Sequence, residues 1–326
     1  MTIRLQPDIS GIAEAARILG AGGLVAFPTE TVYGLGADAT DAHAAARIYE
    51  AKGRPSFNPL IAHVADLEAA QREGMFDPSA LILARAFWPG PLTLVVPVAP
   101  GGTVSELSRA GLASVGLRVP SHPIAQALLR AFGRPVAAPS ANRSGHVSPT
   151  SAAHVLADLD GRLEAIIDGG DCDVGVESTI VACMDGVATL LRPGAVTREQ
   201  LAAALGRDVA TAAHDDEHAP QSPGRMAAHY APATPVTLNA TSVPPGALVL
   251  AFGSTLPEGT GRARVVHNLS QSGNLVEAAA HLYSALRLLD SYGGNAIFVA
   301  EIPHFGLGEA INDRLKRAAI GSMVGD

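Results

Sequence analysis

The amino-acid sequence predicts an α/β protein organised in two domains. Short apolar segments with the composition of buried strands alternate with segments of helical spacing along most of the 326 residues, a pattern that indicates sheets covered by helices. Hydrophobic residues make up 48% of the chain and charged residues 17%, which is enough for sizeable cores and too apolar for a disordered chain. Hydrophobic periodicity lapses over residues 206–240 and then returns. We therefore expect a first domain at 1–205, a linker at 206–240 and a smaller second domain at 241–326.

The elements of the first domain follow from apolar spacing and from Gly and Pro stop signals. Helices are expected at residues 9–19, 42–51, 78–88, 123–132 and 197–205. Strands are expected at residues 24–27, 60–64, 92–96, 113–120, 134–139, 165–170, 177–181 and 190–195. A further helix is expected to begin with Ser148 as its N-cap and Pro149 at its first position. The free N–H groups of such a helix would form an anion site.

The second domain repeats the alternation on a smaller scale. Strands are expected at residues 247–252, 263–266 and 296–300, and helices at 275–292 and 308–319. Strands that alternate with helices imply a small parallel sheet. Gly306 and Gly308 lack the third glycine and the acidic residue of a dinucleotide fingerprint. No catalytic constellation is found here, so we expect a covering or regulatory domain.

Charge and cysteine content limit the classes of function. The 31 acidic residues outnumber the 23 basic ones and give a net charge of -8, which argues against broad binding to a nucleic-acid backbone but allows a local basic cleft. Cys172 and Cys183 form neither a C-x-x-C pair nor a disulfide framework, as expected in a reducing cytosol. The N-terminus has no signal core, and no apolar run approaches the roughly 20 residues that cross a bilayer. We expect a soluble, cytoplasmic protein.

The stretch at residues 52–60 is the strongest candidate for ligand binding. Lys52 and Arg54 lie two residues apart in a segment bracketed by Gly and Pro. Pro55 and Pro59 disfavour helical conformation in the residues before them, so the segment is expected to be an extended loop. Its polar side chains would be those of Lys52, Arg54 and Asn58. The compact ammonium group of a lysine beside the planar guanidinium group of an arginine suits the binding of a polyphosphate or a carboxylate. The alternative is a solvated basic turn, because a short basic cluster is a weak motif.

Other polar residues gather at expected strand ends and in Gly- or Pro-rich loops. They are Thr29, Thr31, Arg118, Ser140, Asn142, Ser148, Ser178 and Arg192. Residues 28–36 follow a buried strand and are expected to form a ligand loop, although an ordinary Gly-rich turn would have the same composition. An arginine in the apolar run at 113–120 needs a partner, either an internal carboxylate or a bound anion. His63, alone in a strand, is either a satisfied core residue or a ligand.

The motifs of several enzyme classes are missing. The sequence has no G-x-S-x-G, no Ser–His–Asp order typical of hydrolases, no His/Cys metal spacing and no G-x-x-x-x-G-K-[ST]. Chemistry at the clustered cations and hydroxyls would then depend on positioning and charge neutralisation rather than on a covalent nucleophile. Such a site suits transfer at phosphorus.

Six short motifs occur in one order across residues 1–205. They are 29–35 (TETVYGL), 52–55 (KGRP) with 58–60 (NPL), 115–120 (VGLRVP), 139–145 (PSANRSG), 177–179 (EST) and 191–194 (LRPG). Together they closely resemble the motifs of the YrdC-type threonylcarbamoyl-AMP synthases. The resemblance implies a twisted, open, mixed sheet in a YrdC-like catalytic domain. The longer branch of that family adds a linker with Ser-Pro-Gly and His-Tyr-Ala-Pro, here at 222–224 and 229–232, and a smaller Rossmann-like α/β domain.

The resemblance also implies a reaction. L-threonine, bicarbonate and ATP would give threonylcarbamoyl-adenylate and pyrophosphate. The product would pass to the machinery that makes N6-threonylcarbamoyladenosine on tRNA, although this step itself would need no tRNA. Mg²⁺ would enter with ATP, bridging its phosphates, and no protein ligand is assigned to the metal.

Residue roles are carried over from the same resemblance. Lys52 and Arg54 would be catalytic. ATP would be held by Lys52, Arg54, Asn58, Ser114, Ser140, Asn142, Ser148, Arg192 and Tyr230. Threonine and its carbamate would be held by Thr31, His63, Arg118, Ala138 (through its backbone) and Ser178.

Two features of the linker range stand out. The family usually has Lys-Tyr-Arg, or something close to it, where this chain has Arg-Met-Ala-Ala at 225–228, so any contact made there must be weaker or differently made. Pro223, Pro232 and Tyr230 suit a lid that closes on a nucleotide and excludes water; a plain tether is the alternative. His214 and His218 flank acidic residues, which we interpret as a solvated acidic linker rather than a metal site.

Two other functions are compatible with related sequences. Related folds have a basic concave face suited to duplex RNA, so a double-stranded RNA-binding module without catalysis is the main alternative, although the net charge of -8 disfavours it. A carbamoyl-transfer role in hydrogenase maturation is disfavoured because the zinc-finger cysteines of that architecture are absent from the sequence.

Overall fold

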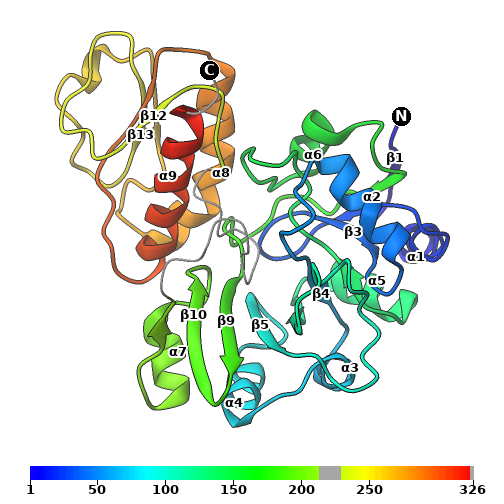
Figure 1. Cartoon of the computed structure of the whole chain (residues 1–326). Helices are drawn as coiled ribbons and strands as arrows, with labels where there is room; N and C mark the ends of the chain where they lie inside the picture. The colour runs from blue at the N-terminus through cyan, green and yellow to red at the C-terminus, as the bar shows by residue number, and fades with distance from the viewer. Residues whose placement is uncertain (213–228, 324–326) are drawn as a thin grey trace.

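The computed structural model describes residues 1–212 and 229–323 and places them around two separate sheets (Figure 1). The larger sheet belongs to the N-terminal part of the chain and the smaller one to the C-terminal part. Among the described residues, no helix has the length and apolar character needed to cross a membrane. The α/β class predicted from the alternation of elements is confirmed, and the division at residues 206–240 stays a prediction.

The larger sheet is mixed and, within the described residues, has eleven strands in the order β1-β8-β2-β3-β7-β4-β6-β5-β9-β10-β11. Its strands are β1 (Ile3–Leu5), β2 (Val25–Phe27), β3 (Gly34–Asp38), β4 (Ile61–His63), β5 (Leu92–Pro97), β6 (Ser114–Arg118), β7 (Val136–Ala137), β8 (Ala165–Ile167), β9 (Thr179–Met184), β10 (Val187–Arg192) and β11 (Ala210–Thr211). Parallel junctions such as β4–β6 and β5–β9 alternate with antiparallel ones such as β5–β6 and β9–β10. The mixed sheet expected from the resemblance is therefore present.

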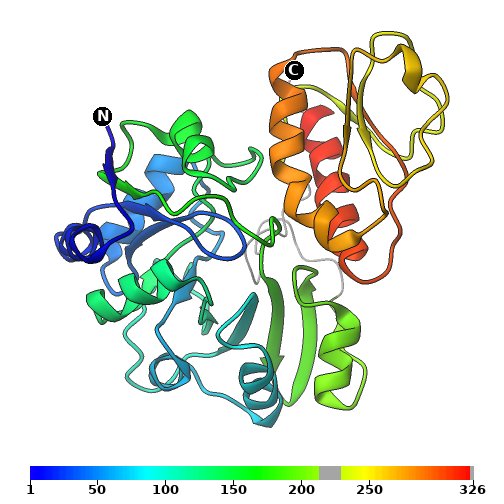
Figure 2. The same ribbon diagram turned by 180° about the vertical axis from the view of Figure 1, so that it is seen from behind.

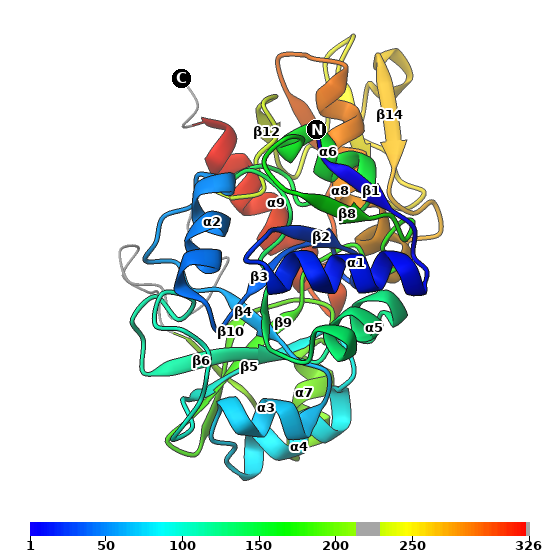
Figure 3. The same ribbon diagram turned by 90° about the vertical axis from the view of Figure 1, so that its right-hand side faces the viewer.

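Helices cover both faces of this sheet. They are α1 (Ile9–Gly20), α2 (Ala42–Lys52), α3 (Leu67–Glu73), α4 (Pro78–Phe87), α5 (Pro123–Phe132), α6 (Ala152–Leu159) and α7 (Arg198–Leu205). Successive residues of β2 point to opposite faces, so Ala26 joins one core while Val25 and Phe27 join the other. The second of these cores lies under α1 and α5, which pack side by side (Figure 3).

The smaller sheet is parallel throughout its described strands. Its order is β12-β15-β13-β14, built from β12 (Val236–Thr237), β13 (Leu248–Ala251), β14 (Val265–Asn268) and β15 (Ile297–Val299). The helices α8 (Leu275–Ser291) and α9 (Leu307–Met323) lie on the side that faces the larger sheet (Figures 1 and 2). The prediction of a small parallel sheet with two helices is confirmed, and α8 and α9 become the elements that meet the N-terminal part.

Several local expectations differ from the structure. The segment Gly34–Asp38, expected within a loop, forms β3 because it pairs with β2 and β7. Helix α3 and strands β1, β11 and β12 were not predicted, since each is short, and β11 and β12 lie within the range expected to be a linker. The helix expected at Ser148 begins instead at Ala152, with Ser151 as its N-cap. The Ser148 hydroxyl donates to Glu177 at 2.6 Å, so a tertiary contact takes the side chain that the local capping signal had assigned to the helix.

Candidate active site

A small polar cavity lies where several strands and loops of the larger sheet converge. Its volume is about 50 Å³. The predicted site residues that line it are Thr31, Arg54, His63, Arg118, Ala138, Ser140, Ser178, Arg192 and Tyr230. The fold therefore brings residues from the N-terminal loops, the strand ends and the last part of the linker range to one place.

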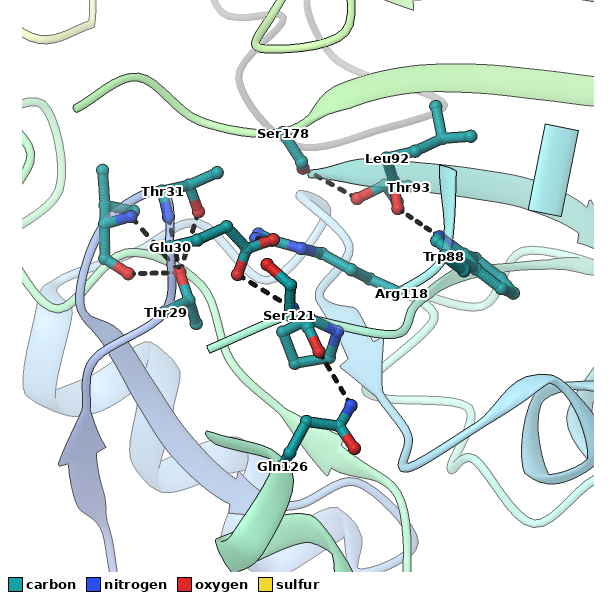
Figure 4. Close-up of polar contacts among 12 residues, drawn as sticks. Thr29, Glu30, Thr31, Trp88, Leu92, Thr93, Arg118, Ser121, Gln126 and Ser178 are labelled. Atoms are coloured by element: carbon teal, nitrogen blue, oxygen red, sulfur yellow. Dashed lines mark hydrogen bonds and ion pairs between the residues drawn. The ribbon is translucent and has the colours of Figure 1, made fainter. Parts of the chain in front are cut away.

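The loop after β2 supplies the Thr31 hydroxyl, which is held in place by the Thr29 side chain (Figure 4). The Thr29 hydroxyl donates to the Val32 carbonyl at 2.7 Å and lies 2.8 Å from the Thr31 hydroxyl. Because the Thr29 hydrogen is used by Val32, Thr31 is the donor within the pair. Both side chains are buried, so the Thr31 oxygen is fixed at the cavity wall with its lone pairs available to a ligand.

Arg118 has an internal carboxylate partner, which answers the question that the sequence left open. Its Nη2 lies 2.8 Å from Oε1 of Glu30, and both side chains are buried. The Ser121 N–H donates to the other Glu30 oxygen at 3.2 Å (Figure 4). Within the described parts of the chain, Nε of Arg118 is buried without a hydrogen-bond partner. Arg118 is therefore held in place by Glu30, yet keeps a donor for a ligand.

Glu30 was not assigned a role from the sequence. Its position inside the motif at 29–35 was the signal that could have identified it, because a carboxylate one residue from the loop's hydroxyls is placed to meet a cation.

Ser178 and Arg192 form a second polar group on the opposite wall. Arg192 Nη2 donates to the Ser178 carbonyl at 2.8 Å and to its hydroxyl oxygen at 3.2 Å. The Ser178 hydroxyl lies 2.8 Å from that of Thr93 on β5 (Figure 4). Thr93, which sequence reasoning missed, thus positions the Ser178 hydroxyl. Burial is the largest effect on Arg192 and lowers its pKa from the usual value.

The loop that follows α2 directs Arg54 to the cavity. Gly53 adopts a left-handed φ of 61° and ends the helix, as its lack of a side chain permits. Arg54 then donates from Nε to the Asn58 carbonyl at 3.2 Å and from Nη2 to the Pro59 carbonyl at 2.9 Å. Burial lowers the pKa of Arg54 to about 10, which still leaves it charged at neutral pH. The prediction of an extended loop is wrong in part: Lys52 is the last residue of α2, and residues 55–58 form a turn in which the Asn58 N–H donates to the Pro55 carbonyl at 3.2 Å. The loop presents Arg54 to the cavity, whereas Asn58 is buried and does not line it.

Lys52 lies behind the cavity wall rather than on it. It is the last residue of α2, and its Nζ donates to the carbonyls of Ser140 and Asn142, at 2.6 and 2.5 Å. Burial, with the nearby Arg54 charge, lowers the pKa of Lys52 well below its usual value. Asn142 is also turned to the backbone, with Nδ2 donating to the Arg143 and His146 carbonyls at 2.8 Å each. In this arrangement both side chains hold the loop that carries Ser140.

Ser114 and Ser148 complete the predicted ATP residues, and neither lines the cavity. Ser114 begins β6 and is four residues from Arg118, so it lies on the same face of the strand roughly 13 Å away. That spacing suits an extended ligand rather than a compact one. Ser148 is buried and directed at Glu177. The ligand roles of the predicted site residues stay predictions.

His63 is at once a cavity residue and a core residue. Its ring lies edge-on to Phe27, with centroids 6.4 Å apart, and Nδ1 is 3.3 Å from the Ile61 carbonyl oxygen. Burial, and next the Arg118 charge, lower the pKa of His63 to about 3. The imidazole is therefore neutral at pH 7. Ala138, beside it in the cavity wall, donates its N–H to the Ile61 carbonyl at 3.0 Å.

His229 and Tyr230 close the cavity from the side of the smaller sheet. The Tyr230 ring is 1% exposed and stacks on Tyr283 of α8, with centroids 5.8 Å apart. Its backbone has a φ of 61°, a conformation that a bulky residue adopts only under constraint from its surroundings. The His229 ring packs edge-on against it at 4.0 Å. The motif residues at 222–224, the departure at 225–228 and the histidines at 214 and 218 lie outside the described residues.

Two family models match successive parts of the chain. Residues 17–194 match the family described as "Telomere recombination", and residues 196–320 match "Threonylcarbamoyl-AMP synthase, C-terminal domain". The threonylcarbamoyl-AMP synthase of Bacillus subtilis (strain 168) is 42% identical over 99% of this chain and 97% of its own length. That of Pyrococcus abyssi (strain GE5 / Orsay) is 40% identical over 94% of this chain and 93% of its own length.

A solved structure extends the similarity to the whole fold. The crystal structure of P. abyssi Sua5 complexed with L-threonine superposes with a TM-score of 0.87 and 38% identity, and covers 99% of this chain and 98% of that one. Similarity at this level extends across both sheets rather than one motif. The chain therefore belongs to the threonylcarbamoyl-AMP synthase family, whose members are nucleotidyltransferases.

Proposed function

We propose that this chain makes threonylcarbamoyl-adenylate and pyrophosphate from L-threonine, bicarbonate and ATP, and that its product serves the N6-threonylcarbamoyladenosine modification of tRNA. The observation that supports it most directly is the grouping of Arg54, Arg118 and Arg192 around one buried cavity. Three cations at such a site are retained only where an anion or an internal carboxylate balances them. Glu30 partners Arg118 and leaves its Nε for a ligand.

Threonine and ATP suit different side chains of the cavity. The Arg118 guanidinium suits the carboxylate of threonine. The hydroxyl groups of Thr31 and Ser178 are neutral and suit its hydroxyl. The neutral His63 adds a polar edge without a charge. Arg54, Arg192 and Ser140 face the same space and suit phosphate oxygens. The P. abyssi relative is complexed with L-threonine, which supports threonine as the amino-acid substrate.

The proposed chemistry needs no nucleophile from the protein. The threonine amine takes up the carbon of bicarbonate as a carbamate, with loss of water. A carbamate oxygen then forms a bond to the α-phosphorus of ATP, and the bond from that phosphorus to the pyrophosphate oxygen breaks. The side chains around the cavity align the groups and neutralise charge that develops on phosphate oxygens, the usual source of catalysis in transfer at phosphorus. Charged Arg54 and Arg192 are placed for that role.

Mg²⁺ is proposed to arrive with ATP. No group of three or more His, Cys, Asp or Glu side chains that could hold a metal occurs in the part of the chain that the structure describes. The two carboxylates nearest the cavity, Glu30 and Glu177, are paired with Arg118 and Arg314. Phosphate oxygens, which are the ligands that Mg²⁺ prefers, would therefore hold the metal. Mg²⁺ would neutralise phosphate charge alongside the arginines.

The cavity must enlarge for this reaction. At about 50 Å³ it is far smaller than the roughly 300–1,000 Å³ of sites that take molecules of this size. His229 and Tyr230 form the wall that separates it from the smaller sheet. We propose that this segment opens to admit ATP and closes over the reactants. Closure would exclude water from a carbamate and a mixed anhydride that both hydrolyse.

Pyrophosphate release tests the proposed function. Purified chain with ATP, Mg²⁺ and bicarbonate should release pyrophosphate only when L-threonine is added, and mass spectrometry should find one threonylcarbamoyl-adenylate for each pyrophosphate. Leaving out bicarbonate, or replacing L-threonine with D-threonine, gives the matched controls. Pyrophosphate released at the same rate without threonine would contradict the proposal.

A further inference from the structure

Within residues 1–212 and 229–323, the buried carboxylate of Glu177 has three hydrogen-bond donors, and two of them come from the C-terminal helices. Ser148 donates to Oε1 at 2.6 Å, and Tyr283 of α8 donates to Oε2 at 2.7 Å. Arg314 of α9 donates from Nε to Oε2 at 2.9 Å, and its side chain is 0% exposed. Glu177 lines the catalytic cavity, whereas Tyr283 and Arg314 lie just outside it. The C-terminal region thus contacts a wall of a cavity that it does not itself line.

Arg314 makes a second contact with the cavity wall. Its guanidinium carbon lies 5.3 Å from the centre of the Tyr230 ring, within the range of a cation–π interaction. The opposite end of the fork donates to the Pro193 carbonyl at 2.8 Å, next to Arg192. Tyr283 also stacks on Tyr230. Arg314 and Tyr283 therefore touch both Glu177 and Tyr230.

A negative charge on Glu177 without a nearby cation would weaken binding of the proposed substrates, which are anions. Burial by itself would raise its pKa, but the Arg314 and Arg192 charges more than offset that effect and lower it to about 2, so the group is ionised at neutral pH. ATP and a threonine carbamate both carry negative charge. A carboxylate facing the same small cavity repels them unless a cation balances it, and repulsion in a desolvated site is strong. Arg314, which also pairs with Asp313 at 2.7 Å, forms the ion pair with Glu177 from outside the cavity. The balance of the Glu177 charge therefore does not depend on Arg192 alone, and Arg54 and Arg192 can face the ligand.

We propose that Arg314 and Tyr283 are positioning residues of the catalytic cavity: they neutralise Glu177 and seat the Tyr230 ring, and thereby set the affinity of the cavity for its anionic substrate. This inference rests on the proposed function. It assigns to the C-terminal region a role in substrate binding, beyond that of a cover.

A charge-removal series tests the inference. Arg314→Met removes the cation that is hydrogen-bonded to Glu177. The KM for ATP should rise by about tenfold or more, which corresponds to the loss of one hydrogen-bonded charge contact, while kcat changes less. Glu177→Gln in the same chain removes the stranded charge, so the double variant should recover most of the ATP affinity. Tyr283→Phe keeps the ring stack and loses one donor, and should raise the KM by about threefold.

The matched control is the ion pair between Arg198 of α7 and Glu309 of α9, at 2.7 Å. It also joins the two parts of the chain, but neither residue lines the cavity. Arg198→Met should therefore leave the KM for ATP unchanged. A purely structural role for Arg314 would appear as a lower melting temperature with no recovery in the Arg314→Met, Glu177→Gln double variant.

Direct ATP binding separates this inference from the proposed reaction. Titration calorimetry with Mg-ATP on the same full-length variants should show the same loss and recovery of affinity, whether or not turnover is seen. If the wild-type chain binds ATP but makes no product, the reaction is wrong and the calorimetry still decides the inference. Wild-type ATP affinity in Arg314→Met, absent recovery in the double variant, or no ATP binding by the wild type would each overturn the inference.

Discussion

The ammonium nitrogen of Lys52 lies 2.6 Å from the carbonyl oxygen of Ser140, so the end of α2 holds the loop that carries a cavity residue. A second carbonyl of the same loop, that of Asn142, accepts from the same nitrogen. Lys52 and Arg54 are two residues apart, yet one lies behind the wall and the other faces the cavity. The two cations are therefore expected to affect turnover for different reasons.

Arg54→Ala should reduce turnover strongly and leave the fold intact. Loss of a charged phosphate contact in a partly desolvated site costs on the order of 2–4 kcal/mol, which corresponds to a rate loss of roughly 100-fold or more. The measurement is the steady-state rate of pyrophosphate release, with circular dichroism to check the fold. Arg85→Ala removes an exposed arginine of α4 and is the control. Rates near wild type in Arg54→Ala would place the phosphate site elsewhere.

Lys52→Ala should reduce turnover to a similar extent, through the loop at 140–142. The buried carbonyl of Asn142 and the part-buried carbonyl of Ser140 lose their donor, and an unsatisfied buried group costs about 1–3 kcal/mol. We expect the free energy of unfolding to fall as well. Urea denaturation of Lys52→Ala against the wild type measures the loss. A Lys52→Ala chain as stable and as active as the wild type would contradict the loop-holding role.

The threonine pocket should discriminate by hydroxyl more strongly than by methyl. Serine lacks only the methyl group, so its kcat/KM should be about 10–200-fold lower than that of threonine. Valine lacks the hydroxyl and would lose the hydrogen bonds proposed between the substrate hydroxyl and the buried Thr31 and Ser178 side chains, so it should not be used. Pyrophosphate release with each amino acid at equal concentration provides the comparison. Equal rates of pyrophosphate release with valine and with threonine would show that the pocket does not recognise the threonine hydroxyl.

Tyr230→Ala should lower product yield more than it lowers ATP consumption. The ring closes the cavity wall against Tyr283, and without it water would reach the carbamate and the adenylate. The measurement is the ratio of threonylcarbamoyl-adenylate to pyrophosphate. Tyr230→Phe is the matched control, because within the described residues the Tyr230 hydroxyl has no hydrogen-bond partner. An unchanged ratio of product to pyrophosphate in Tyr230→Ala would indicate that the segment around Tyr230 is only a tether between the two parts of the chain.

The two buried histidines of the cavity predict a loss of stability in mild acid. Burial lowers the pKa of His63 and of His229 to about 3 in the folded chain, whereas the unfolded value is about 6.5. The unfolded chain binds more protons between these values, so their contribution is present above pH 6.5 and is lost as the pH falls toward 3. Each histidine can contribute a slope of up to about 1.4 kcal/mol per pH unit.

Urea unfolding at pH 7, 6 and 5 measures that slope. His63→Gln should unfold with a shallower dependence on pH than the wild type, and an exposed histidine, His43→Gln on α2, provides the control. A slope that His63→Gln does not change would show that His63 is not buried in the neutral form. Glu177 adds a further loss at lower pH, because its pKa of about 2 lies below the usual value for Glu.

The sequence by itself determined most helices and strands, because their signals are local. The apolar spacing and the Pro and Gly boundaries of Pro123–Phe132 predict that helix to the residue. Capping by Thr197 and termination at Gly206 similarly define α7. The motifs also identified most of the residues that line the cavity. Each of these conclusions depends on residues within a few positions of one another.

Only the tertiary structure decided which polar groups meet. Ser148 has the local signal of a helix cap, but Glu177 takes its hydroxyl. Glu30 binds Arg118 across 88 positions, and Arg314 reaches Glu177 across 137. A buried charge must find a partner wherever the packing places one, and sequence spacing carries no information about contacts between distant elements. The partners that hold the cavity's charged side chains were therefore visible only once both sheets were in place.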